Sequence, residues 1–292
     1  MFRRYVMLAL VLIGSLLPLG CAERLQGSGP IRVAASIPPL VDMARQIGGS
    51  RVTVVGLVAP GSSVHTYEPT PRQVQFVSTA DILLLNGVNL EFWAPKVIEA
   101  ANNPKLRVVN TSEGLTLLEQ NSPEGGNPHV WLDPQNAIHQ AERVRDALIA
   151  VDPGHRATYE ENAARYIGEL QALDQEIAAQ TATWSHRRFV AFHSAWVYFA
   201  KRYNLQQAAA IEEFPGKEPS PEYLAGIVGL VRELRVPAVF AEPQLPPQAA
   251  QAVATEAQIK VVTLDPLGGV SGRETYVQLM RYNVAQMAEA LK

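Results

Sequence analysis

The chain has 292 residues, of which 47% are hydrophobic and 18% charged, and its formal net charge is -3. This composition is typical of a globular protein with room for two domains, and it excludes a strongly basic surface of the kind that binds nucleic acid. The one cysteine, Cys21, lies near the amino terminus, so the body of the chain has neither disulfides nor a cysteine-rich zinc module.

The first 20 residues have the features of a secretory signal peptide. Arg3 and Arg4 precede an apolar stretch, 5–18, that is short for a membrane span, and Leu17-Pro-Leu-Gly-Cys then resembles a bacterial lipobox. We therefore expect residues 1–20 to be removed, Cys21 to carry a lipid anchor, and residues 21–30 to form a tether. The alternative is a plain secretory signal followed by a chance cysteine. Both interpretations place the protein in the periplasm or at the outer face of the cytoplasmic membrane.

From residue 31 onward, short apolar runs alternate with segments of helical periodicity. Because these runs are continuous rather than alternating, they predict parallel strands that are buried on both faces. The fold class is therefore α/β, with two lobes that each hold a mainly parallel four-stranded sheet flanked by helices. The expected strands are 31–36, 52–58, 82–86 and 107–110 in the first lobe, and 189–192, 207–211, 238–242 and 260–264 in the second.

One long, rigid helix is predicted to join the two lobes. Asp152-Pro-Gly ends the helix before it, and apolar side chains then recur at steps of three and four along one face. We expect the linking helix to lie within 153–185, and a helix of about 30 residues is roughly 45 Å long at 1.5 Å per residue. The two lobes then cover residues 31–152 and 186–292. The apolar face consists of Tyr159, Ala163, Tyr166, Ile167, Leu170, Leu173 and Ile177.

Four side chains of metal-ligating type lie in loops next to predicted strands or helix starts. They are His65, His129, His193 and Asp265. Ligands of open α/β sheets bind at the carboxyl ends of the strands, so the four side chains should meet there, two from each lobe. Imidazole and carboxylate are ligands that a borderline ion such as zinc prefers. A single loop histidine is more often an ordinary surface residue, and it is the joint pattern that predicts a metal site.

The sequence around these residues resembles that of the metal-binding lipoproteins of bacterial ABC importers for zinc and manganese, the cluster 9 or A-I solute-binding proteins. The resemblance covers residues 31–292 and rests on His65-Thr-Tyr-Glu-Pro-Thr-Pro, Pro128-His-Val-Trp-Leu-Asp-Pro, Phe192-His-Ser-Ala-Trp, Glu218-Pro-Ser-Pro and Leu264-Asp-Pro-Leu-Gly-Gly.

The resemblance implies a binding protein rather than an enzyme, with the ion held in the cleft between two lobes by His65, His129, His193 and Asp265. It implies an ABC permease membrane subunit as partner, together with the membrane through the lipid anchor, and we expect a monomer. Glu242 ends a predicted strand and is a candidate for orienting a ligand imidazole. The alternative for Glu242 is an ordinary solvent-facing strand end.

The identity of the bound ion follows less directly from the sequence than the ligand set does. Three imidazoles and one carboxylate suit tetrahedral zinc, whereas manganese-binding relatives more often have glutamate at the third position, so His193 favours zinc over manganese or iron. Two features point toward manganese instead. Zinc-specific relatives often carry a long loop rich in histidine before the second ligand, whereas residues 119–127 form a short segment without histidine. In addition, His65-Thr-Tyr-Glu-Pro is similar to the manganese-type branch of the family. We expect zinc to bind more tightly than manganese. Because ligand imidazoles must be neutral, we also expect affinity to fall below about pH 6.

Two alternatives come from other functional classes. A zinc-dependent hydrolase needs an open metal position with a general base beside it, and such enzymes often carry closely spaced ligands such as His-Glu-x-x-His, which this sequence lacks. A surface adhesin or other interaction lipoprotein leaves little trace in one sequence and is compatible with metal binding.

Overall fold

The computed structural model describes residues 29–120, 125–212 and 216–292. The predicted signal peptide and Cys21 lie outside these ranges, so both stay predictions. Within the described ranges, none of the helices combines the length and the apolar character needed to cross a membrane.

Two four-stranded sheets form the centres of the two lobes, as the sequence predicts. All strand pairs are parallel, and the strand orders β2-β1-β3-β4 and β6-β5-β7-β8 are equivalent in the two lobes. The strands are β1 (Ile31–Ala35), β2 (Val52–Gly56), β3 (Ile82–Leu85), β4 (Arg107–Asn110), β5 (Arg188–Ala191), β6 (Gln206–Ala210), β7 (Ala238–Ala241) and β8 (Lys260–Thr263).

Each sheet is covered on one face by its own pair of helices and on the other by a core that both lobes share. The outer pairs are α2 (Pro71–Val77) with α3 (Ala94–Ala101), and α7 (Pro221–Leu234) with α8 (Gln248–Ala257). The shared core lies against α1 (Pro38–Gly48), α4 (Pro134–Val151), α5 (Arg156–Thr181), α6 (Val197–Arg202) and α9 (Tyr276–Leu291). The two lobes are therefore continuous through one body of buried apolar side chains.

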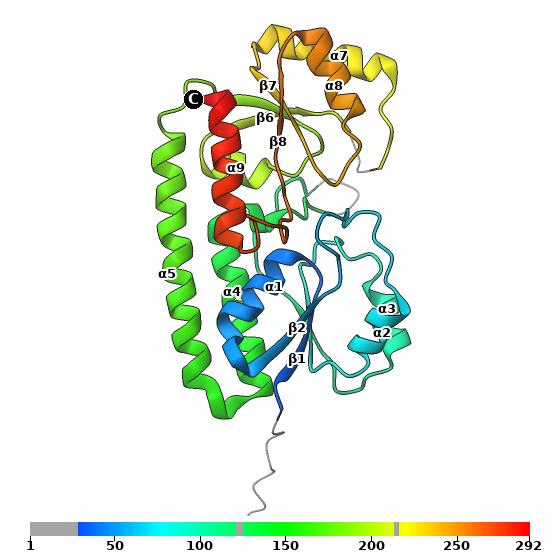
Figure 1. Cartoon of the computed structure of the whole chain (residues 1–292), viewed down its shortest axis with the longest axis vertical. Helices are drawn as coiled ribbons and strands as arrows, with labels where there is room; N and C mark the ends of the chain where they lie inside the picture. The colour runs from blue at the N-terminus through cyan, green and yellow to red at the C-terminus, as the bar shows by residue number, and fades with distance from the viewer. Residues whose placement is uncertain (1–28, 121–124, 213–215) are drawn as a thin grey trace, which may run out of the picture.

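The long linking helix is α5, which runs alongside both lobes (Figure 1). Its 26 residues span about 39 Å, and a short 3₁₀ turn at Pro153–His155 precedes it. The predicted apolar face is buried, apart from the half-buried Ile167. The helix ends at Thr181 rather than at residue 185, where Arg187 donates to the Thr181 carbonyl and the chain turns toward β5.

Local sequence signals set the helix starts that border the central crevice. Thr70 and Gln73 form a capping box at the start of α2, with Pro71 at the first helical position. Asp133 caps α4 by accepting a hydrogen bond from the Gln135 amide, again with proline next. These caps fix the ends of the two loops that carry His65 and His129.

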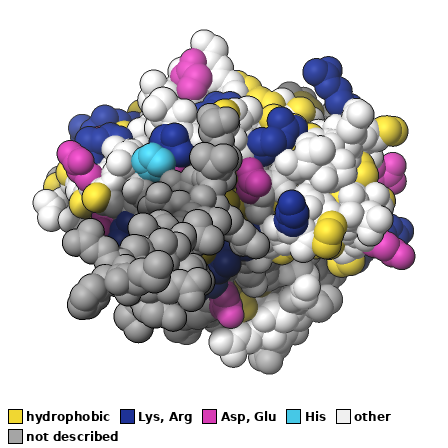
Figure 2. Space-filling view, turned by 90° about the horizontal axis from the view of Figure 1, so that it is seen from below, with side chains coloured by type: hydrophobic (Ala, Val, Ile, Leu, Met, Phe, Trp, Pro, Cys, Tyr) yellow, Lys and Arg dark blue, Asp and Glu magenta, His cyan; other side chains and the backbone are white. Residues whose placement is uncertain are grey.

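The face of the molecule seen from below is mixed in charge where the described residues are visible (Figure 2). Seen from below, basic and acidic side chains of the described residues are interspersed rather than gathered by sign (Figure 2). Such a pattern agrees with a small net charge.

Candidate metal centre

The candidate site lies where the carboxyl ends of both sheets meet. In the second lobe, β5 and β7 are neighbours at the point where the strand order reverses, the place where open α/β sheets form a ligand crevice. His193 lies two residues beyond β5, and Glu242 directly follows β7. In the first lobe, His65 lies in the loop between β2 and α2, and His129 lies in the loop before α4.

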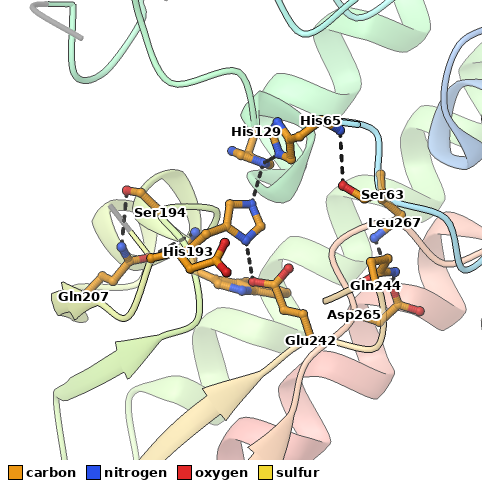
Figure 3. A network of polar contacts seen from close by, with 12 residues as sticks. Ser63, His65, His129, His193, Ser194, Gln207, Glu242, Gln244, Asp265 and Leu267 are labelled. Carbon is orange, nitrogen blue, oxygen red and sulfur yellow. Dashed lines mark hydrogen bonds and ion pairs between the residues drawn. The ribbon is translucent and has the colours of Figure 1, made fainter. Parts of the chain in front are cut away.

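Three imidazoles converge from these loops. His129 Nε2 lies 3.2 Å from His65 Nε2 and 3.0 Å from His193 Nε2. One nitrogen from each ring falls within 4.8 Å of the others. Figure 3 shows His65 and His129 from one lobe facing His193 from the other. The structure thus brings together three residues that are separated by 64 positions at each step.

The other ring nitrogen of each buried imidazole has a protein partner. His129 Nδ1 lies 3.0 Å from Asn127 Oδ1, which also accepts a hydrogen bond from the His129 amide. His193 Nδ1 lies 2.7 Å from Glu242 Oε1, and both side chains are almost fully buried. Asn127 Oδ1 is an acceptor, so the proton of His129 belongs on Nδ1 and the lone pair of its Nε2 faces the centre. The Glu242 carboxylate favours the same arrangement for His193 by its charge and proximity, although the contact lies outside hydrogen-bond geometry. Glu242 therefore lies where an orienting partner should.

Burial also favours the neutral form of the His65 and His129 rings. It lowers the pKa of His65 to about 3, with the charge of His193 as the second cause. The same two causes, with His65 as a third, hold the pKa of His129 well below its ordinary value. Neutral imidazole is the form that binds metal. The His65 and His129 rings are thus ready to coordinate a metal at neutral pH, and their protonation should weaken binding only well below the pH of about 6 that unperturbed imidazoles predict.

Two of the three nitrogen separations match what one small cation needs, and the third pair lies within 4.8 Å. Ligand bonds of 2.0–2.1 Å in a tetrahedral shell place two nitrogens about 3.3–3.4 Å apart. The observed separations of 3.0 and 3.2 Å therefore need only a slight expansion. Lone pairs this close repel one another, and a cation between them removes that repulsion.

The cavity beside the imidazoles is too small for an organic ligand. Its volume is about 10 Å³, close to the least that one water molecule needs. Apolar side chains form much of its wall, so an ion bound there has few waters and a low local dielectric. The lining consists of Ser63, Val64, His65, His129, Trp131, His193, Glu242, Gln244, Leu245, Pro266 and Leu267.

Asp265 does not join the three imidazoles in this structure. Its Oδ1 atom accepts hydrogen bonds from the Gln244 side chain at 2.7 Å and from the Leu267 and Gly268 amides at 3.0 Å. Its Oδ2 atom lies 3.3 Å from Arg273 Nε. Figure 3 shows Asp265 beside Gln244 and Leu267, apart from the imidazole rings. A role for Asp265 as ligand therefore stays a prediction, and it requires the carboxylate to leave these partners.

Sequence reasoning missed Asn127, which lies two residues before His129 and is 4% exposed. A signal for it was present. Asparagine side chains often bond the backbone two residues further on, as Asn127 Oδ1 does with the His129 amide. What the spacing alone does not reveal is that the same oxygen also reaches the His129 ring.

Comparison with known proteins finds a family model and relatives that match almost the whole chain. The family model described as zinc-uptake complex component A, periplasmic, matches residues 33–290. The zinc-binding lipoprotein AdcA of Streptococcus pneumoniae is 28% identical over 97% of this chain, and the chain spans 60% of the length of AdcA. The manganese-binding lipoprotein MntA of Halalkalibacterium halodurans is 30% identical over 96% of each chain.

Among solved structures, a crystal structure of ZnuA superposes with a TM-score of 0.82 at 33% identity. The match covers 89% of this chain and 99% of the ZnuA chain. The architecture of two sheets and one long helix is therefore shared with a protein of the same family.

Proposed function

Since the chain belongs to the family of periplasmic zinc-uptake component A proteins, we propose that it captures a divalent transition metal ion outside the cytoplasmic membrane and delivers it to an ABC permease. The observation that carries this proposal is the convergence of three Nε2 atoms from two lobes around a space that fits one ion. His65, His129 and His193 are the proposed ligands. Cys21 is the proposed site of lipid anchoring.

Zinc is the proposed ion, with manganese as the second candidate. Three nitrogen ligands in a mostly apolar cavity suit zinc, whereas manganese prefers oxygen-rich shells. Asp265 is the proposed fourth ligand only in a loaded form in which its carboxylate exchanges Gln244 and the loop amides for the ion. Without that exchange, water completes the shell.

The contacts of Glu242 argue against the hydrolase alternative. A metal-activated water needs a general base within reach of the open metal position. Glu242 Oε1 instead lies 2.7 Å from His193 Nδ1, on the side of the ring opposite the nitrogen that faces the centre. It is placed to orient the imidazole rather than to accept a proton from water.

Metal competition on metal-free protein tests the proposal. We expect isothermal titration to show tighter binding of zinc than of manganese. His193→Glu replaces one nitrogen ligand with oxygen, so it should weaken zinc binding by more than about 10-fold and narrow the preference over manganese. An unmodified protein that binds manganese more tightly than zinc would contradict the assignment of the ion. A protein that binds neither would contradict the function itself.

A further inference from the structure

Asn127 joins the two lobes at the proposed metal centre, and it does so through both ends of one side-chain amide. We propose that Asn127 is a positioning residue: its Oδ1 atom orients His129, while its Nδ2 atom fixes His129 relative to the lobe that carries His193. The inference rests on the proposed metal-binding function and goes beyond it, because it concerns how the distance between ligands of different lobes is set.

The oxygen end of the amide acts within the first lobe. Asn127 Oδ1 lies 3.0 Å from both the His129 amide nitrogen and His129 Nδ1. These two contacts hold the backbone and the ring of the same residue, so they fix the rotation of the imidazole as well as its tautomer. An amide oxygen does this without adding negative charge.

The nitrogen end of the amide reaches the second lobe. Asn127 Nδ2 donates to the carbonyl of Ser194, the residue directly after His193, and to Glu119 Oε2 at 2.8 Å. The Ser194 hydroxyl in turn donates to Glu119 Oε1 at 3.2 Å. Asn127, Glu119 and Ser194 therefore form a closed set of contacts across the crevice.

A second bridge holds the same loop. The Tyr198 hydroxyl, from the start of α6, donates to the Asn127 carbonyl at 2.8 Å and accepts from the Leu118 amide at 3.0 Å. Tyr198 is 3% exposed, so these bonds are shielded from water. The loop before His129 is thus tied to the second lobe at the side chain and at the backbone of Asn127.

The backbone conformation of Glu119 indicates that this residue is held in place by its surroundings. Glu119 has φ 54°, in the left-handed region that costs a side-chain-bearing residue energy. Such a conformation persists where surrounding contacts hold it, and the bonds from Asn127 and Ser194 to the Glu119 carboxylate are such contacts. The contacts among Asn127, Glu119 and Ser194 thus form a local cross-lobe link beside the 3.0 Å separation of His129 Nε2 from His193 Nε2.

Two substitutions of Asn127 distinguish the role of its amide oxygen from the role of its amide nitrogen. Asn127→Ala removes both, so we expect zinc affinity to fall by about 10–100-fold and the visible spectrum of the cobalt-loaded protein to change as His129 loses its orientation. Asn127→Asp keeps an oxygen acceptor for His129 but cannot donate to Ser194, and it places a carboxylate against Glu119. We expect its cobalt spectrum to change less than that of Asn127→Ala, because the carboxylate still orients His129 although it makes Nε2 more basic, while loss of the cross-lobe bond makes zinc release to a chelator about 10-fold faster.

Asn162→Ala is the matched control. It removes an asparagine side chain that donates to the Ile47 carbonyl at 3.0 Å, far from the crevice. It should leave the cobalt spectrum, zinc affinity and zinc release unchanged. Should Asn127→Ala fail to fold, Glu119→Ala takes its place, because Glu119 is exposed and its loss removes an acceptor of Asn127 Nδ2 while sparing both contacts to His129. It should then speed zinc release.

The outcomes distinguish this inference from the proposed function. If the unmodified protein binds zinc and Asn127→Ala binds it equally well with the same cobalt spectrum, the positioning role is overturned while the function stands. If Asn127→Asp or Glu119→Ala releases zinc as slowly as the unmodified protein, the part of the proposal that concerns the link from Asn127 Nδ2 to the second lobe is overturned. If the unmodified protein binds no zinc, the failure lies with the proposed function.

Discussion

His129 and His193 are oriented by partners of different charge. Asn127 presents a neutral amide oxygen to His129 Nδ1, whereas Glu242 presents a buried carboxylate oxygen to His193 Nδ1. A carboxylate partner makes the opposite ring nitrogen more basic and therefore a stronger metal ligand. Of the two, His193 should be the stronger donor to the ion.

Removal of the Glu242 carboxylate tests this difference. We expect Glu242→Ala to weaken zinc binding by about 10–100-fold, since His193 loses both its orientation and the added basicity. Glu242→Gln should cost less, because its amide oxygen can still lie against Nδ1 of His193. Titration calorimetry with zinc measures both variants. Equal affinities for Glu242→Ala and the unmodified protein would show that Glu242 has no orienting role.

At the level of elements, one carboxylate on α5 holds helices of both lobes. Asp174 accepts hydrogen bonds from Arg202 at the end of α6, from the neighbouring Tyr203 at 2.9 Å, and from Gln135 in α4 at 3.0 Å. Burial raises the pKa of the Asp174 carboxyl, but these hydrogen bonds outweigh burial and leave its pKa below the usual value. The folded state therefore favours the charged form of Asp174.

This lowered pKa predicts how stability depends on pH. The contribution of Asp174 is fully present above the unfolded value of about 3.9 and is lost as the pH falls through the lower folded value. Near pH 7, Asp174→Asn should reduce the free energy of unfolding by about 2 kcal/mol. Below about pH 4 the difference from the unmodified protein should shrink, as denaturant unfolding at a series of pH values would measure.

Asp146→Asn is the control for the Asp174 prediction. Asp146 pairs with Arg145 at 2.8 Å on the surface, where its side chain is 59% exposed. An exposed ion pair contributes at most about 1 kcal/mol. A loss for Asp174→Asn that matches this control, or that stays constant down to pH 3, would contradict the anchoring role of Asp174.

On the scale of the whole molecule, the lobes share a core rather than meeting only at the crevice. The buried cluster includes side chains of both sheets together with α1, α4, α5 and α9. Polar contacts reinforce it: the Tyr276 amide at the start of α9 donates to Asp42 in α1 at 2.9 Å, and Trp131 donates to the Pro266 carbonyl at 2.7 Å. A wide hinge opening would expose this core to water, which is unfavourable.

We therefore expect small lobe movements on metal binding. X-ray scattering from metal-free and zinc-loaded protein should give nearly superposable profiles, with changes limited to the loops around the centre. Thermal unfolding should still shift upward with zinc, because a ligand that binds only the folded state stabilises it. Scattering profiles that differ by a large closure would contradict the rigid arrangement.

The fold could be predicted well from the sequence because its signals are local. Continuous apolar runs indicated all eight strands, and the periodic face of Tyr159 to Ile177 indicated α5. Thr70 and Asp133, each followed by proline, are also local signals, and they cap the starts of α2 and α4. Element ends were less certain: α5 stops at Thr181, where a tertiary contact from Arg187 competes with helix continuation. The domain boundaries stay predictions.

The sequence by itself determined the architecture and which histidines could meet, because strand ends of a parallel sheet lie at one edge whatever surrounds them. Only the tertiary structure decided how each side chain at that edge is used. Asp265 follows a strand just as His193 does, yet its carboxylate is bonded to Gln244 and to loop amides. Asn127 reaches Ser194 across the crevice. Which partner each side chain bonds depends on which donors and acceptors lie within about 3 Å of it in the folded chain. For partners as distant in sequence as Asn127 and Ser194, separation along the chain does not predict that distance.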